Sequence, residues 1–370
     1  MEKIRLGIVG LGNMGSGHFY NVMGGKCPSV KVTAVCDIIA DKMEKANAHP
    51  EVVCFTDYIE MLDSGLVDAV LIAVPHYDHP TVAKECFKRR IHVLTEKPAG
   101  VYARQVREMN EAAEKSGVKF GIMFNQRTNP MYAKAREIVS SGQLGELKRM
   151  VWIITNWYRT QAYYDSGSWR ATWNGEGGGV LLNQAPHNLD LWQWIFGMPK
   201  RVRAFCEFGK YHNIGVEDDV TIFGEYENGA TAAFITTTGD ACGTNRLEIT
   251  GDRGKIVIEH GKLSWWKLET PEREFCFTSK EGFATPSTTY EEFTAPEPEG
   301  HPEVLEAFAQ SILKGTEMIA DGKEGLNSLS ISNAAYISAW TNDWADIPTD
   351  EALFEKHLNE LCKNEKSSKK

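Results

Sequence analysis

A glycine-rich turn near the N-terminus is the first segment whose residue types and spacing could do chemistry. Gly10-Leu11-Gly12-Asn13-Met14-Gly15 follows the apolar run Ile4–Val9 and opens a helix-like stretch that reaches Met23. In such a G-x-G-x-x-G turn the glycines permit a tight bend, close approach of a pyrophosphate, and packing of helix on strand. Free N–H groups at the helix start then favour phosphate. The turn predicts a dinucleotide site at Gly10, Gly12, Asn13, Met14 and Gly15; the alternative is a glycine turn without a cofactor.

An acidic residue follows at the distance that a dinucleotide site requires. Asp37 ends the second apolar run, 22 residues beyond Gly15. A carboxylate at this place accepts hydrogen bonds from the adenosine ribose hydroxyls. Ile38 and Ile39 come next, and no adjacent arginine is present to bind a 2′-phosphate. We therefore predict NAD rather than NADP, with Lys42 as the nearby cation that argues the other way.

Two further segments carry groups that could move a proton. Lys97 lies in Glu96-Lys97-Pro98, directly after the apolar run His92–Leu94. The carboxyl edge of a parallel sheet is where such folds bind ligands, although a lone lysine is more often an ordinary surface residue.

Asn183 and His187 stand four residues apart, so in a helix they would share one face. Pro186 suits a first helical turn, with Asn183 or Gln184 near the N-cap, and the glycines at 177–179 let backbone approach a ligand. From these residues alone, a capping or core histidine and a catalytic histidine are equally open.

Aromatic and arginine side chains are concentrated just before those glycines. Aromatic rings stack on the C–H face of a pyranose, while amide and charged groups reach its hydroxyls. Packing against another subunit is the alternative use of the same residues. Arg127, at the start of the second half of the chain, is a further candidate contact. The substrate residues predicted in this segment are Trp157, Tyr158, Arg159, Tyr163, Tyr164, Trp169 and Arg170.

Four segments, in this order and spacing, resemble the Gfo/Idh/MocA family, which includes glucose–fructose oxidoreductase and inositol dehydrogenase. They are GIVGLGNMG, AVPHYDHP (73–80), EKPAG (96–100) and GGGVLLNQAPHNLD (177–190). The likeness extends from Lys3 to about Leu361. It implies a Rossmann domain, a second α/β domain whose open sheet forms the oligomer interface, and NAD(P)-linked redox chemistry on sugars, cyclitols or related polyols.

The resemblance also implies roles for single residues. Lys97 matches the family's active-site lysine, which often precedes a cis proline, and His187 matches its catalytic histidine. Asn183 stands where several members have an aspartate, and an amide cannot take a proton at neutral pH, so it would only orient a hydroxyl. The residues expected at the cofactor are Ala73, Val74, Pro75 and His79, in the loop that lines it in the family, together with Glu96 and Lys97.

The expected reaction is oxidation of a secondary hydroxyl, with C3 of a glucose-type ring as the expected carbon. The segment before the glycines is similar to family members that oxidise glucosides or anhydrosugars there. We expect His187 to be the base and Lys97 to orient the hydroxyl, with the reverse assignment open. The few arginines favour a neutral ring. Two alternatives are an NAD-dependent glycosidase that oxidises C3 transiently and a non-catalytic regulator that senses NAD or sugar.

The apolar pattern predicts the elements that position these residues. Up to residue 124, short apolar runs alternate with helix-like stretches, which predicts a doubly wound parallel sheet. In the second domain, 125–370, period-two segments predict an α/β domain with a large, mostly antiparallel open sheet. Its open face predicts a dimer or tetramer. We expect residues 282–302 to form an exposed connection and residues 363–370 to form a frayed end. The helices at about 302–345 are expected to pack toward the first domain.

Composition excludes several classes of protein. The 370 residues hold 40 Lys+Arg against 50 Asp+Glu, and a net charge of −10 argues against nucleic-acid binding. No run approaches the roughly 18 apolar residues of a membrane span, and the strand predicted from Ile4 leaves no room for a signal peptide. Eight cysteines without a CxxC pair indicate reduced thiols and no metal site. We expect a cytoplasmic enzyme with a small carbohydrate substrate.

Overall fold

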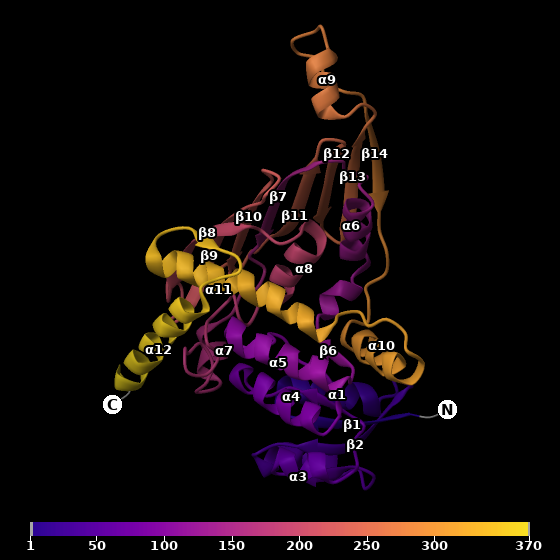
Figure 1. Cartoon of the computed structure of the whole chain (residues 1–370), viewed down its shortest axis with the longest axis vertical. Coiled ribbons are helices and arrows are strands. Elements are labelled where there is room, and N and C mark those ends of the chain that lie inside the picture. The colour runs from indigo at the N-terminus through magenta and orange to yellow at the C-terminus, as the bar shows by residue number, and fades with distance from the viewer. Residues whose placement is uncertain (1–2, 369–370) are drawn as a thin grey trace. The chain divides into compact units, whose positions relative to one another are not determined.

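The computed structural model describes residues 3–368, which form two compact units (Figure 1). The first unit contains the chain up to Thr128, Gly175–Gly177 and Pro298–Leu329. The second contains Asn129–Asn174, Gly178–Glu297 and the chain from Ser330. Each unit is built on its own sheet.

The sheet of the first unit is parallel and has the order β3-β2-β1-β4-β5-β6. The order reverses between β1 and β4, and the crevice at such a switch point is where open α/β sheets bind ligands. The predicted doubly wound parallel sheet is confirmed. Its strands are β1 (Ile4–Val9), β2 (Val30–Cys36), β3 (Val53–Phe55), β4 (Ala69–Ile72), β5 (His92–Thr95) and β6 (Phe120–Ile122).

Helices bury both faces of this sheet, which explains why its central strands are continuously apolar. All four residues of β4 are fully buried. The helix α10 comes from a distant part of the sequence, and its residues Val304, Leu305 and Phe308 join the core with Leu94 and Met123. The helices of this unit are α1 (Asn13–Met23), α2 (Glu44–Asn47), α3 (Tyr58–Asp63), α4 (His79–Lys88), α5 (Ala103–Ser116) and α10 (His301–Lys314).

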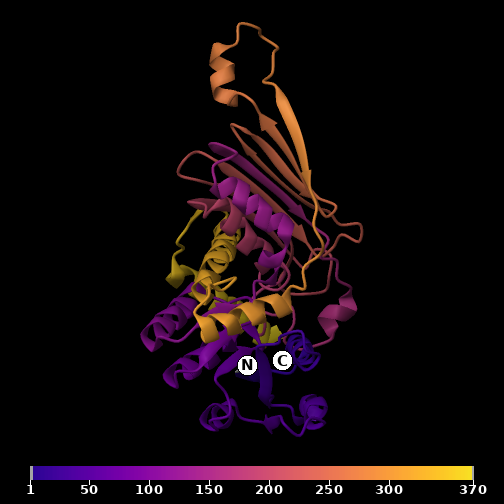
Figure 2. The same ribbon diagram turned by 90° about the vertical axis from the view of Figure 1, so that its right-hand side faces the viewer.

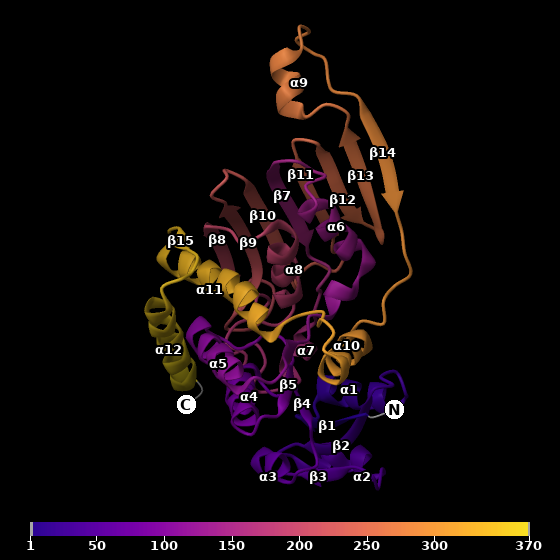
Figure 3. The ribbon, with the colours of Figure 1, turned by 45° about the vertical axis from the view of Figure 1, so that its right-hand side comes forward.

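The sheet of the second unit has nine strands in the order β14-β13-β12-β11-β7-β10-β9-β8-β15 (Figure 3). It is antiparallel apart from the β7–β10 pair, so the predicted mostly antiparallel sheet is confirmed. Its strands are β7 (Leu147–Ile154), β8 (Arg201–Phe208), β9 (Glu217–Glu225), β10 (Thr231–Thr237), β11 (Asn245–Gly251), β12 (Gly254–Glu259), β13 (Lys262–Leu268), β14 (Thr288–Phe293) and β15 (Ala345–Asp346).

Two helices, α6 and α8, lie on one face of this sheet (Figures 1 and 3). The ring of Trp192 in α8 stacks on Phe234 of β10 with centroids 5.6 Å apart, and Phe234 meets Trp152 of β7 edge-on. Trp192 is fully buried and belongs to the core of this unit. The helices of this unit are α6 (Pro130–Ser140), α7 (Gln161–Asp165), α8 (Pro186–Phe196), α9 (Glu272–Thr278), α12 (Glu351–Ser368) and, from Ser330 on, α11 (Gly325–Thr341).

Two predictions about the last third of the chain are wrong. The expected connection at 282–302 contains β14, which pairs with β13 in the register Leu263↔Phe293, and α9 precedes it beyond the end of the sheet (Figure 2). Flanking prolines and acidic residues concealed this strand. The tail is helical up to Ser368, and Glu365 of this helix accepts the N–H groups of Trp173 and Asn174. Residues 369–370 lie outside the described residues.

Candidate active site

The glycine turn joins β1 to α1, and its three glycines occupy three different environments. Gly10 has φ of +92°, and a Cβ there would lie 2.5 Å from the Ala73 carbonyl oxygen. A Cβ on Gly15 would lie 1.8 Å from the Gly10 oxygen, whereas a Cβ on Gly12 would meet no atom within 4 Å. Gly12 is also the N-cap of α1, where no side chain caps the helix. The turn therefore leaves open space at a helix N-terminus, as a bound pyrophosphate requires.

Asp37 is tied to this turn directly. Its Oδ2 accepts the N–H of Leu11 at 2.8 Å, and its Oδ1 accepts the N–H of Ile39 at 2.9 Å. The Nζ of Lys42 lies 3.9 Å from Oδ2. A carboxylate has about four acceptor positions, so two remain for ribose hydroxyls. The side chain of the neighbouring Ile38 is 87% exposed, beside the same carboxylate.

The loop that follows β4 contacts the glycine turn through its backbone. The N–H of Ala73 donates to the Val9 carbonyl at 2.8 Å, and Pro75 precedes a single turn of 3-10 helix. His79 lies beneath the loop: its Nδ1 is 2.7 Å from the Pro98 oxygen and its Nε2 is 2.7 Å from the Val74 oxygen. Burial lowers the pKa of His79. This histidine links the loop to the segment after Lys97.

Lys97 follows β5 and precedes Pro98 across a cis peptide bond. The adjacent Glu96 is buried; its Oε2 accepts the Lys97 N–H at 3.2 Å, and its Oε1 lies 2.6 Å from Nε2 of His18 in α1. Burial opposes the charge of Glu96, but the hydrogen bond and charge of His18, with the charges of Lys97 and His301, lower its pKa to about 2. Sequence reasoning had not identified His18.

Arg127 is buried in the first unit, where its Nη2 donates to Glu324 at 2.8 Å. Its guanidinium also lies over the ring of Phe124 at 5.4 Å. These contacts give Arg127 a structural role. Glu324 is so distant in sequence that the isolated arginine could not indicate the pair.

In the second unit, the turn before α8 holds Asn183 and Gln184. Pro186 and His187 are the first residues of α8, and His187 is buried. The N-cap of this helix is Ala185, so Asn183 and Gln184 lie near the N-cap as expected, although neither is the cap itself. Both amides instead contact Tyr163.

Tyr163 is the centre of the aromatic cluster. Its hydroxyl accepts Nη1 of Arg170 at 2.9 Å and Nε2 of Gln184 at 3.4 Å, and it donates to Oδ1 of Asn183 at 3.4 Å. The guanidinium of Arg170 lies 4.6 Å from the Tyr163 ring centroid, and that of Arg159 lies 5.1 Å from it. We call this set the Tyr163 cluster; its members are Trp157, Arg159, Tyr163, Trp169, Arg170, Asn183 and Gln184.

The cluster is anchored to α8 by Trp157, whose Nε1 donates to Oδ1 of Asn188 at 3.2 Å, next to His187. Tyr158 is exposed beside it. Tyr164, in contrast, is buried; its hydroxyl donates to Thr238 at 2.8 Å and its ring packs on His212. Tyr164 therefore packs the core side of the segment, which its sequence position next to Tyr163 did not reveal.

A cavity of about 710 Å³ borders the same segment. Residues from three places in the sequence line it, including Arg170, Asn213 and Asn364 of α12.

Across residues 3–368, no three His, Cys, Asp or Glu side chains are grouped to hold a metal ion. Over the same range no helix has both the length and the apolar character of a membrane span.

The parallel sheet, its glycine turn and the lysine at its carboxyl edge define a dinucleotide-binding oxidoreductase. The chain belongs to the Gfo/Idh/MocA family. Residues 4–124 match the model described as oxidoreductase family, NAD-binding Rossmann fold, and residues 132–257 match that of the GFO/IDH/MocA C-terminal domain. The resemblance inferred from the motifs is confirmed.

Several characterised proteins are similar to this chain. Inositol 2-dehydrogenase of Rhizobium meliloti is 23% identical over 90% of this chain and 96% of its own. The rhizopine catabolism protein MocA of the same species is 27% identical over 68% of this chain and 78% of its own.

Solved structures show the same fold. The WlbA dehydrogenase of Bordetella pertussis, in complex with NADH and UDP-GlcNAcA, is 25% identical with a TM-score of 0.78, over 95% of this chain and 99% of that one. Levoglucosan dehydrogenase, in complex with NADH and levoglucosan, is 19% identical with a TM-score of 0.77, over 94% of this chain and 100% of that one.

Proposed function

We propose that the protein is an NAD-dependent dehydrogenase that oxidises a secondary hydroxyl, at C3, of a neutral glucose-type sugar or glycoside. The observation that carries this proposal is the Tyr163 cluster, which joins aromatic rings and two amides to the start of the helix that bears His187. Stacking surfaces suit the C–H face of a pyranose, and amides suit its hydroxyls. Relatives named as inositol and levoglucosan dehydrogenases support the substrate class.

The first unit has the residues that a dinucleotide needs. The open space at Gly12 suits the pyrophosphate, and the Asp37 carboxylate suits the adenosine ribose. A bound nicotinamide supplies the hydride acceptor. A 2′-phosphate would be repelled by the Asp37 carboxylate. The Lys42 ammonium, the nearby cation that could bind this phosphate, already lies 3.9 Å from that carboxylate. We therefore propose NAD rather than NADP.

The proton of the hydroxyl must leave when its carbon loses a hydride. In this proposal His187 takes that proton, and Lys97 donates a hydrogen bond that stabilises the developing negative charge on oxygen. Asn183 orients the hydroxyl, because an amide does not accept a proton at neutral pH. In a variant of this scheme, Lys97 takes the proton and His187 donates the hydrogen bond.

The contacts of Arg170 and Arg159 within the protein support a sugar ring without a negative charge. Arg170 donates to the Tyr163 hydroxyl and stacks on two rings, and Arg159 stacks on two as well. A carboxylated or phosphorylated sugar would require guanidinium groups directed at the anion. The WlbA complex contains a nucleotide-linked ligand, UDP-GlcNAcA, so the test of the proposal includes charged sugars.

A screen for NADH formation tests the proposal. Methyl glucoside, levoglucosan, myo-inositol, glucose 6-phosphate and UDP-linked uronic acids are each incubated with the enzyme and NAD or NADP. We expect NADH with a neutral ring, and NMR should locate the ketone at C3. Turnover confined to the phosphate or the uronic acids, or a ketone at another carbon, would contradict the proposal. Aglycone release without net formation of NADH would indicate the NAD-dependent glycosidase. The absence of turnover with every compound would indicate the non-catalytic regulator.

The open face of the nine-stranded sheet suggests a homodimer or homotetramer. On that face Phe205 of β8 is 58% exposed and Phe223 of β9 is 40% exposed. Val151, Ile153 and Ile235 continue the surface across β7 and β10. A second copy of the chain would cover these apolar side chains.

A further inference from the structure

A buried carboxylate in the second unit contacts the turn that leads into α8. Glu217 is the first residue of β9 and is fully buried. Its Oε1 accepts the N–H of Gly179 at 3.0 Å and of Leu181 at 2.9 Å, and its Oε2 accepts that of Gly179 at 2.9 Å. The N–H of Val180 donates to the Glu217 carbonyl at 3.1 Å. One residue of β9 therefore holds three successive residues of the turn.

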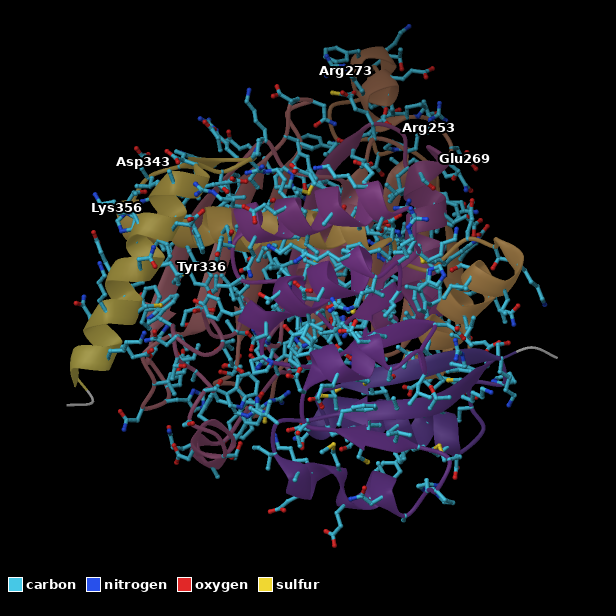
Figure 4. All side chains as sticks on the ribbon, turned by 60° about the horizontal axis from the view of Figure 1, so that its bottom comes forward. Arg253, Glu269, Arg273, Tyr336, Asp343 and Lys356 are labelled. Carbon is cyan, nitrogen blue, oxygen red and sulfur yellow. The ribbon has the colours of Figure 1, made fainter. Side chains whose placement is uncertain are left out.

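A phenol completes the partners of this carboxylate. Tyr336 of α11, labelled in Figure 4, donates its hydroxyl to Oε1 of Glu217 at 2.7 Å. Its ring stacks on Trp340 with centroids 5.4 Å apart and meets Trp173 edge-on at 5.6 Å. A Cβ on Gly178 would lie 2.1 Å from the Tyr336 oxygen, so glycine is required there. Packing therefore fixes the Tyr336 ring, and the absence of a side chain at Gly178 leaves room for its hydroxyl.

The turn passes this restraint to the residues of the proposed chemistry. The N–H of Asn183 donates to the Gly179 carbonyl at 3.0 Å, and that of Ala185 donates to the Val180 carbonyl at 2.8 Å. Ala185 is the N-cap of α8, in which His187 is the second residue. Hydrogen bonds therefore connect Glu217 to Asn183 and to the first turn of α8.

On the basis of the function proposed above, we propose that Glu217 and Tyr336 form a latch that positions Asn183 and His187 for proton transfer. Both are positioning residues, because they act on the site only through the turn at 179–185. A buried carboxylate is costly unless its oxygens accept several hydrogen bonds. The donors that surround Glu217 offset this cost and fix the turn against the start of β9. A misplacement of about 1 Å at a catalytic group can reduce the rate about 100-fold.

Three variants separate positioning from general stability. Glu217→Gln keeps the shape but turns one acceptor oxygen into an NH₂ group. Tyr336→Phe removes a single buried hydroxyl. Tyr226→Phe is the matched control, because the Tyr226 hydroxyl is also enclosed, accepts Nε1 of Trp192 and donates to the Gly197 carbonyl at 3.1 Å. It lies at the opposite end of α8 from the latch.

Hydrogen–deuterium exchange of the peptide 178–190 measures the latch without any substrate. We expect Glu217→Gln to accelerate exchange at least about tenfold and Tyr336→Phe by a few-fold, whereas Tyr226→Phe leaves this peptide unchanged. With methyl glucoside and NAD, kcat should fall about tenfold or more in Glu217→Gln. The Kd for NAD should stay within about twofold in all three variants, because the glycine turn belongs to the first unit.

Unchanged exchange in Glu217→Gln would overturn the latch, and so would a loss of protection equalled by Tyr226→Phe. Faster exchange with an unchanged kcat would overturn the positioning role. A wild-type enzyme without turnover contradicts the proposed dehydrogenase instead, and the exchange experiment still tests whether Glu217 holds the turn.

Discussion

The Nε2 of His18 lies 2.6 Å from Oε1 of Glu96, and both side chains are buried. His18 belongs to α1, the helix that begins at the glycine turn, while Glu96 precedes the lysine of the proposed chemistry. The pair therefore connects the dinucleotide helix to Lys97 within one unit.

His18→Leu should destabilise the protein by about 3–5 kcal/mol, because it leaves a buried carboxylate without its partner. Urea unfolding at pH 7 measures the change. His49→Gln is the control in the same unit, since the His49–Glu51 pair is exposed and should contribute less than about 1 kcal/mol. Equal effects of the two substitutions would show that burial of the His18 pair is irrelevant.

Glu217 predicts a dependence of stability on pH. Burial raises the pKa of Glu217 to about 7, against an ordinary 4.5, although Tyr336 and the N–H groups of Leu181 and Gly179 oppose the shift. The folded protein therefore binds this proton more tightly than the unfolded chain, and stability should fall as pH rises from about 4.5 to about 7. At about 1.4 kcal/mol per unit the loss is about 3 kcal/mol relative to Glu217→Gln. Parallel unfolding curves of wild type and Glu217→Gln between pH 5 and 8 would contradict this.

Asp37→Ala should weaken NAD binding by about 10- to 100-fold, because charge-assisted hydrogen bonds to the ribose and to Leu11 are lost. It should also reduce the discrimination between NAD and NADP. Calorimetry with both cofactors measures this, and Asp41→Ala, an exposed carboxylate nearby, is the control. Equal affinity of the wild type for NAD and NADP would remove the basis of the prediction.

Lys97→Ala and His187→Ala should each lower kcat by about 100- to 10,000-fold while NAD binding is retained, as expected for groups that move or stabilise a proton. Stopped-flow and steady-state NADH assays measure the rates. His260→Ala is the control, because this histidine is exposed. The scheme fails if Lys97→Ala turns over at a near-normal rate.

Phe205→Glu combined with Phe223→Glu should convert the proposed oligomer into a monomer, because both carboxylates would be buried against a second copy. Sedimentation velocity measures the mass. Phe283→Glu, at a fully exposed position away from the strands, should leave it unchanged. A wild type that sediments as a monomer would exclude this interface.

Local pattern was enough to predict much of the fold. The strand β1 has the bounds of the apolar run Ile4–Val9 that predicted it, and β5 (His92–Thr95) extends the predicted run His92–Leu94 by one residue. Continuous apolar residues with turn residues on either side determine both strands. β14 was missed because its pairing with β13 depends on a partner strand rather than on its own polar residues.

The site was predictable as a set of residue types but not as a set of contacts. Tyr163 and Tyr164 are equivalent in the sequence, yet one is the centre of the cluster and the other is buried against His212. Glu217 and His18 gave no local signal, because their partners are 38 and 78 residues away along the chain. Such long-range polar pairs depend on tertiary packing, which no sequence window contains.

The outermost strand β14 has a consequence for how the protein behaves at high concentration. Its free edge would accept hydrogen bonds from any extended chain, and unprotected edges of this kind nucleate fibrous aggregates. Glu291 and Glu292 place adjacent negative charges there, each balanced by a lysine of β13 at 2.5 Å and 2.7 Å. A further strand would have to place its own side chains beside these charged groups when it added. The sheet can therefore end in solvent without recruiting misfolded neighbours.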